Sequence, residues 1–100
     1  MRTLPASVQW RAGYQLKQVQ LGLEPQDWKP MATIGPGVKE IRLREDSGAY
    51  RVIYIAKFEE AVYVLHCFEK HSQRTSSRDI DVATSRYREL IRERASRGSL

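Results

Sequence analysis

Apolar residues recur at helical spacing near the start of the chain. Five of them are separated by four, four, three and four positions: Val8, Ala12, Leu16, Val19 and Leu23. This spacing places them on one face of an amphipathic helix. Pro5 suits the first turn of such a helix, and Gly22 can take the left-handed conformation that ends one. The pattern predicts a first helix over residues 5–21.

The periodicity is lost between residues 24 and 37. This stretch contains Pro25, Trp28, Pro30 and the run Gly35-Pro36-Gly37, and proline and glycine at this density are typical of turns. We therefore expect a long turn-rich connection with at most one short helical turn.

Alternation with a period of two begins at Val38. Residues 38–44 alternate between apolar and mostly basic side chains, as a half-buried strand requires. Residues 50–56 and 62–68 are rich in β-branched and aromatic residues, which favour strands. Because the intervening turns at 45–48 and 59–60 are short, the three strands should form an antiparallel meander.

The last third of the chain predicts a surface loop over residues 69–75 and then a second helix. Ser76 and Asp79 have the spacing of a capping box. An apolar stripe continues the helix to about Arg94: Ile80, Ala83, Tyr87, Leu90 and Ile91. Residues 96–100 are expected to be a frayed tail. The pattern as a whole predicts one α+β domain over residues 1–100.

Charge adds a candidate partner. Seventeen Lys and Arg residues against twelve Asp and Glu give a net charge of +5 and an isoelectric point near 9.7. A small basic domain attracts polyanions, so nucleic acid is the first candidate, although many small proteins are basic for other reasons.

Other classes of chemistry find little support. Cys67 is the single cysteine, which excludes an internal disulfide and a thiolate metal cluster, and there is no phosphate-binding glycine loop. We expect no metal and no cofactor. The sequence also has no apolar signal core and no run of about 18 apolar residues, so we expect a cytoplasmic protein without a membrane partner.

Arg51 is the least expected residue of the predicted sheet. It stands within an apolar strand, where an unpaired charge would be costly to bury. It must therefore face either a polar cleft or a carboxylate of the same chain, and Glu40 and Glu69 are the two considered. Both possibilities remain open at this point.

If consecutive strands pair, several cations share one face and one end of the sheet. They are Arg42, Arg44, Arg51 and the pair Lys70-His71. Converging cations can hold an RNA backbone and stabilise a phosphorane-like transition state. The alternative is that these are ordinary solvated residues of exposed strands.

Five short motifs, in order along nearly the whole chain, resemble the phage-derived-protein branch of the RelE/HigB toxin superfamily. The motifs are DWKPM (27–31), GVKEIRLR (37–44), GAYRVIY (48–54), VYVLHCFEK (62–70) and RDI (78–80). Each is weak by itself, and the argument rests on their shared order.

The resemblance implies a RelE-like fold, with N-terminal helical segments, a small antiparallel meander of three or four strands and a C-terminal helix. It implies a toxin of a type II toxin–antitoxin system that cleaves mRNA on the ribosome, with a helix-turn-helix antitoxin as its partner. The alternatives are a non-nucleolytic toxin like the gyrase-inhibiting ParE relatives, and a truncated RNA- or protein-binding module, because fold alone does not fix function.

The resemblance also assigns roles to residues. Arg51 matches the strand arginine that contacts the scissile phosphate, and Lys70 and His71 fall where the remaining catalytic groups are expected. The positions implied for RNA and ribosome binding are Lys39, Arg42, Arg44 and Arg74. Since the ordinary histidine pKa of about 6.5 suits proton transfer, we expect His71 to act as the general acid or base.

The sequence departs from the family pattern in three respects. Relatives carry a strand before the first helix, and this chain shows none there, so an uncovered sheet edge and a homodimer formed through it are expected. Position 71 is commonly lysine in this branch, and directly after the loop this chain has no tyrosine where some relatives place a catalytic one. Trp10, Trp28 and Tyr87 are predicted to belong to the core, and His66 to pack near the end of the sheet.

Overall fold

The structure is a computed structural model that describes residues 4–71 and 74–98. Its elements follow one another as helix, four strands and helix. They are α1 (Ala6–Gln20), β1 (Trp28–Pro30), β2 (Val38–Glu45), β3 (Gly48–Ile55), β4 (Tyr63–Lys70) and α2 (Ser77–Gly98). The predicted α+β class and the RelE-like arrangement are confirmed.

The four strands form one antiparallel sheet in the order β1-β2-β3-β4. The register of β3 and β4 shifts once: Ile53 pairs with His66 and Tyr54 pairs with Val64. Leu65 is therefore an extra residue in β4, the arrangement of a β-bulge. As a result, Leu65 and His66 both face α2, although they are neighbours in sequence.

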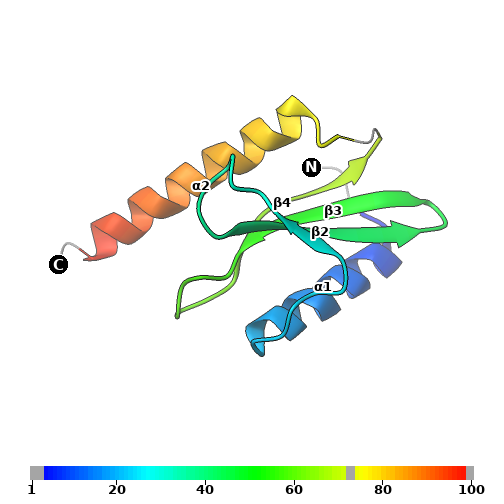
Figure 1. The fold of residues 1–100 in the computed structure, drawn as a ribbon, viewed down its shortest axis with the longest axis horizontal. Helices are drawn as coiled ribbons and strands as arrows, with labels where there is room; N and C mark the ends of the chain where they lie inside the picture. Colours follow the sequence, from blue (N-terminus) through cyan, green and yellow to red (C-terminus); the bar gives the residue numbers. More distant parts are fainter. Residues whose placement is uncertain (1–3, 72–73, 99–100) are drawn as a thin grey trace.

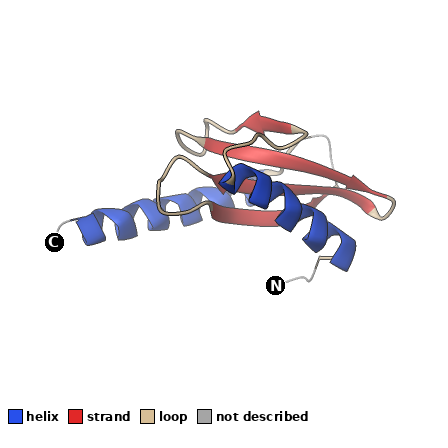
Figure 2. Ribbon diagram, turned by 90° about the horizontal axis from the view of Figure 1, so that it is seen from below, coloured by secondary structure: helices blue, strands red, loops and turns tan. Residues whose placement is uncertain are grey.

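The two helices cover opposite faces of the sheet. Figure 1 shows α2 along one side and α1 along the other, and in Figure 2 the C-terminal half of α2 extends beyond the strands. Each helix has its own core. The buried core under α2 comprises Met31, Ile34, Val38, Ile53, Ile55, Leu65, Phe68, Ala83 and Leu90. The buried core under α1 comprises Val8, Ala12, Ile41, Leu43, Tyr50, Val52 and Tyr54.

The predicted boundaries of α1 are close to the observed ones. The helix begins one residue after Pro5 and ends at Gln20. Gly22 has a φ of 84°, the left-handed conformation that glycine adopts without steric penalty. Trp10 contradicts its prediction, because its side chain points away from the core and is 71% exposed.

The turn-rich connection contains a strand that the sequence did not predict. β1 pairs with the middle of β2, with Trp28 opposite Ile41 and Pro30 opposite Lys39. The predicted turn at Gly35-Pro36-Gly37 is present, and a side chain at Gly35 would collide with the ring of Tyr87. Tyr87 packs against the core under α2, as predicted.

The C-terminal part of the chain is more regular than predicted. Glu69 and Lys70 belong to β4 and not to the loop, and residues 96–98 continue α2. The predicted cap is confirmed: the Asp79 N–H donates to Ser76 Oγ at 3.2 Å, and Ser76 Oγ donates to Asp79 Oδ2 at 2.7 Å. The predicted loop residues 72–73 and tail residues 99–100 lie outside the described residues.

Candidate nucleic-acid interface

Four cationic side chains share one face at one end of the sheet. Arg42 pairs with Arg51 across β2 and β3, and Arg44, Ala49 and Lys70 form the next row across β2, β3 and β4. Since residues directly opposite one another point to the same side, these side chains lie on the face that also carries α2. We call Arg42, Arg44, Arg51 and Lys70 the cation cluster. Their predicted convergence is confirmed.

A buried carboxylate lies beside the cluster. Glu40 is 0% exposed, and its Oε1 lies 3.5 Å from Arg51 Nε and 3.7 Å from Lys29 Nζ. Its Oε2 accepts a hydrogen bond of 2.7 Å from the Thr75 hydroxyl. A fully buried carboxylate needs such partners, because removing a charge from water is expensive. Glu40 thus links three segments: β1, β3 and the residues before α2.

The ion pair between Glu40 and Arg51 is incompletely satisfied. Glu40 Oε1 and Arg51 Nε are both buried and neither makes a hydrogen bond in the part of the chain that the structure describes. Their separation of 3.5 Å exceeds the usual hydrogen-bond length. Arg51 Nη1 donates to the Tyr50 carbonyl at 3.1 Å. The two groups attract each other as opposite charges, but their geometry is not that of a bidentate arginine–carboxylate pair.

Of the two environments considered for Arg51, the partner carboxylate is present, and it is Glu40. The Arg51 side chain is only 11% exposed. Burial lowers the pKa of Arg51, and the charge of Glu40 partly opposes that effect. A guanidinium nevertheless stays protonated at neutral pH, so Arg51 remains a cation at the edge of the cluster.

Burial and the neighbouring cations both act on the pKa of Lys70. Burial lowers the pKa of Lys70, and repulsion from Arg51 lowers it further. Arg42 and Arg44 are exposed, and Arg42 has a long contact of 3.9 Å with the exposed carboxylate of Asp27. Repulsion of this kind favours the arrival of an anion, because a phosphate would relieve it.

Three of the residues predicted for the site lie outside the paired rows of the cluster. Lys39 faces the opposite side of the sheet, where its Nζ lies 4.4 Å from the centre of the Trp28 ring. His71 is exposed, with Nε2 at 3.8 Å from Glu69 Oε1. Arg74 is exposed in the segment between β4 and α2. The sheet register therefore gathers Arg42, Arg44, Arg51 and Lys70 and puts Lys39 on the other face. His71 and Arg74 follow β4 and are not placed by the register, and Arg74 precedes Thr75, which bonds to Glu40 beside the cluster.

The segment that leads into α2 is fastened across the sheet at two points. Thr75 bonds to Glu40 of β2, and Asp79 Oδ1 lies 2.8 Å from His66 Nε2 of β4. Burial raises the pKa of Asp79, but the hydrogen bonds from Ser76 and His66 outweigh it, and the net pKa lies below the ordinary value. The sequence identified the cap but gave no sign of the histidine that pairs with it.

Both histidines border a hollow of about 410 Å³ at the edge of β4. His66 stacks on Phe68 with ring centroids 4.8 Å apart, and Arg78 and Arg86 add positive charge to the rim. Phe68 is the strand partner of Arg51, but the residues that line the hollow do not include the four of the cation cluster.

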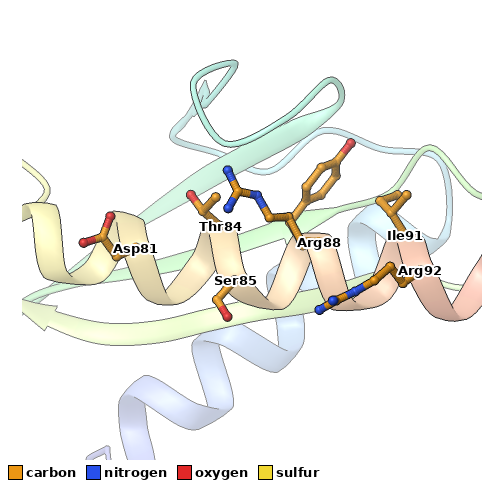
Figure 3. A pocket seen from close by; sticks show the side chains of 7 residues that line it. Asp81, Thr84, Ser85, Arg88, Ile91 and Arg92 are labelled. Carbon is orange, nitrogen blue, oxygen red and sulfur yellow. The ribbon is translucent and has the colours of Figure 1, made fainter.

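A larger hollow of about 750 Å³ runs along α2 itself (Figure 3). All its lining residues come from that helix: Asp81, Thr84, Ser85, Tyr87, Arg88, Ile91 and Arg92. A functional pocket usually combines groups from several elements. This hollow is an open groove beside one helix, and we assign no chemistry to it.

Residues 4–71 and 74–98 contain no group of three or more His, Cys, Asp or Glu side chains placed to hold a metal ion. Neither helix, as far as it is described, has the length and apolar character to cross a bilayer.

The chain was compared with known proteins. Residues 1–88 match the family model described as phage derived protein Gp49-like (DUF891). No curated protein and no solved structure matches. The family model covers well over half of the chain, and the fold agrees with the RelE-like arrangement. The chain therefore belongs to the Gp49-like family of phage-derived proteins, a RelE-like toxin family.

Proposed function

We propose that this protein is a toxin of a type II toxin–antitoxin system, of the HigB-like kind, that cleaves mRNA on the ribosome and so inhibits translation. The observation that carries the proposal is the cation cluster at one end of the sheet. Fixed cations attract the RNA backbone and stabilise the extra negative charge of a phosphorane-like transition state. Membership of a RelE-like toxin family supports the same function.

The proposed reaction is attack of a ribose 2′-OH on the adjacent phosphate. A base removes the hydroxyl proton, an acid protonates the leaving 5′-oxygen, and a cyclic phosphate remains on the upstream fragment. Arg51 holds the phosphate, Lys70 supplies a second cation, and His71 acts as either the base or the acid. The remaining cations proposed for RNA and ribosome binding are Lys39, Arg42, Arg44 and Arg74.

A non-nucleolytic toxin, of the gyrase-inhibiting ParE-like kind or a binding module of the same fold, is the second candidate. Two observations favour it: the charge of Arg51 is already balanced by Glu40, and His71 lies beside Glu69 rather than in the cluster. Under either function, we propose that the protein acts in the cytoplasm and that a helix-turn-helix antitoxin neutralises it. A homodimer through the edge of the sheet is also part of the proposal.

The test is induction of the chain, of Arg51→Ala and of Arg92→Ala in a bacterial host, with growth and new mRNA 5′ ends as readouts. Arg92→Ala is the matched control, because it removes one exposed arginine from α2, away from the cluster. We expect arrest with ribosome-phased cleavage in the wild type and in Arg92→Ala, and neither in Arg51→Ala. Arrest with intact mRNA would favour the second candidate.

His66→Ala and His71→Ala separate the two histidines in the same assay. Full cleavage by His71→Ala would exclude His71 as the acid or base. Loss in His66→Ala alone would instead assign the proton transfer to the histidine that Asp79 orients.

A further inference from the structure

The outward side of α1 carries a row of exposed apolar side chains. Trp10, Tyr14 and Leu21 are 71%, 50% and 65% exposed. The rings of Trp10 and Tyr14 stack, with centroids 5.8 Å apart and an angle of 10° between their planes. Single exposed apolar residues are ordinary, but two stacked rings, with Leu21 further along the same side at the C-terminal cap of the helix, indicate an interaction surface.

The row lies opposite the side of α1 that packs on the sheet. The buried residues of this helix are Val8, Ala12 and Gln15. With about 100° of rotation per residue, positions 10, 14, 17 and 21 lie on the other side of the helix axis. They follow one another at intervals of four, three and four, the seam spacing with which two helices pack together. We call Trp10, Tyr14, Lys17 and Leu21 the outer seam.

A partner could approach this seam closely. Gly13 lies beside it, and nothing stands within 4 Å of the place that a side chain there would occupy. Small residues at a helix surface let a second backbone come near. A flat pair of stacked rings beside a glycine is therefore suited to the side of another helix.

Charge indicates which helix would fit. Lys17 is the charged residue of the outer seam, and residues 4–23 contain no Asp or Glu. Arg11, on the same helix, is already paired with Glu45 at 2.7 Å. A second copy of this chain would bring a further net charge of +5 and another Lys17. A partner helix with a carboxylate opposite Lys17 is therefore electrostatically complementary to the outer seam.

The seam is also separate from the cation cluster. α1 covers one face of the sheet (Figure 1), and the strand register places the cluster on the other. Exposed aromatic rings can stack on nucleic-acid bases, but such sites normally combine the rings with a positively charged groove. Here the cation cluster lies on the far face, and the outer seam itself carries one cation, Lys17. The helical spacing of the row favours a protein partner.

We propose that the outer seam is the docking surface for an amphipathic helix of a partner protein, one with apolar residues along its contact face and a carboxylate opposite Lys17. The central contacts are Trp10 and Tyr14. Their substitution weakens binding most, because aromatic residues at the centre of an interface contribute the largest share of its affinity. This inference does not depend on mRNA cleavage.

The test is an NMR titration of the full chain with two synthetic helical peptides about three heptads long. Both have leucine at the seam positions, and they carry either glutamate or lysine at all flanking positions. We expect the acidic peptide to shift the amide signals of α1 and the basic peptide to bind much more weakly. Trp10→Ala should raise the Kd of the acidic peptide about tenfold or more. Val64→Ala, which truncates an exposed side chain on β4, should leave it unchanged.

A charge exchange makes the test specific. Lys17→Glu should weaken the acidic peptide and strengthen the basic one, a reversal that general stickiness of the peptide would not produce. Unfolding midpoints of the variants, measured in urea, should match the wild type because the altered side chains are exposed.

Four outcomes would overturn the proposal. They are failure of the acidic peptide to bind, equal binding by Trp10→Ala, a dimer in sedimentation that Trp10→Ala abolishes, and a single-stranded RNA oligonucleotide that shifts the α1 amides more strongly than the peptide. The third would make a second copy the occupant, and the fourth would make it nucleic acid.

Discussion

One face of the sheet, the one that carries α2, has two halves of opposite character, although both are built by β2, β3 and β4. The half under α2 is apolar and no more than 3% exposed at four strand positions: Val38, Ile53, Ile55 and Leu65. The half beyond it carries the cation cluster, of which Arg42 and Arg44 are exposed. The backbone pairing is continuous across both halves.

The boundary between the halves explains why they can coexist. Glu40 lies there, fully buried. Its Oε1 faces Arg51 and Lys29, and its Oε2 accepts a hydrogen bond from Thr75. The covered half would not accept Arg42 or Arg44, because charges under α2 would lose water without gaining partners. The comparison teaches that the buried core and the cations proposed to bind an anion occupy separate stretches of the same strands, with Glu40 between them.

The largest effect is expected in the covered half. Ile53→Ala removes a 0% exposed side chain from the centre of the core under α2. The lost burial and the cavity left behind should lower the free energy of unfolding by about 4 kcal/mol. Urea denaturation measures this loss, and Val64→Ala, an exposed strand position, should lose less than about 0.5 kcal/mol.

The boundary is expected to give a smaller effect. Glu40→Gln keeps the shape of the side chain but leaves Arg51 without its charge partner, which should cost about 2 kcal/mol. A double-mutant cycle with Arg51→Met isolates the coupling between them. If the two losses simply add, Glu40 and Arg51 are not coupled and the boundary has no electrostatic role.

The contacts of the Asp79 carboxylate at the start of α2 should contribute about 1 kcal/mol in total. Asp79→Ala removes the acceptor of the Ser76 hydroxyl and the partner of His66, each worth about 0.5 kcal/mol at a partly exposed site, whereas the bond from the residue 79 N–H to Ser76 Oγ is kept. The pKa of Asp79 lies below its ordinary value of 3.8. The stabilisation from ionised Asp79 is therefore fully present above that value, and it is lost as pH falls through the lower pKa of the folded state.

The free energy of unfolding of the wild type and of Asp79→Ala, measured at a series of acidic pH values, tests this dependence. The difference between the wild type and Asp79→Ala should shrink as the pH falls below the ordinary value. A difference that stays constant down to the lowest pH would mean that Asp79 stabilises the fold through packing alone.

The uncovered half should give the smallest effect on stability. Arg42→Ala removes an exposed side chain and should change the free energy of unfolding by less than about 0.5 kcal/mol. Its effect should appear in RNA binding, where the slope of log affinity against log salt should fall by about one. Filter binding at several salt concentrations measures the slope, with Arg92→Ala as the control. An unchanged slope would remove Arg42 from the interface.

Local pattern accounts for most of the predictable fold. α1, α2 and the meander follow from periods of 3.6 and two, which are properties of neighbouring residues. β1 was missed because it has three residues, one of them Pro30, and its pairing with Ile41 is set by β2. The predicted core position of Trp10 was wrong because it ignored the helical spacing: position 10 lies about 200° around the helix from Val8 and so opposite the apolar face.

The site was predictable in part for the same reason. Alternation along paired strands placed Arg42 and Arg51 on one face and brought Lys70 to their end of the sheet. The burial of Glu40 could not be predicted, because its partner Thr75 lies 35 residues away. The alternating pattern groups Glu40 with the exposed residues Arg42 and Arg44. Its burial is explained by Thr75, which lies in the segment before α2 and bonds to it.

The extra residue in β4 has a consequence for how this protein can vary. Leu65 and His66 both face α2 only because one residue more stands in β4 than in the paired part of β3. A deletion at Val64 would restore plain alternation, and either the core would lose its leucine or Asp79 its histidine. Natural variation at Val64 should therefore take the form of replacements, while gaps and insertions between Tyr63 and His66 should be rare. We therefore expect selection to act more strongly on the length of this stretch than on its composition.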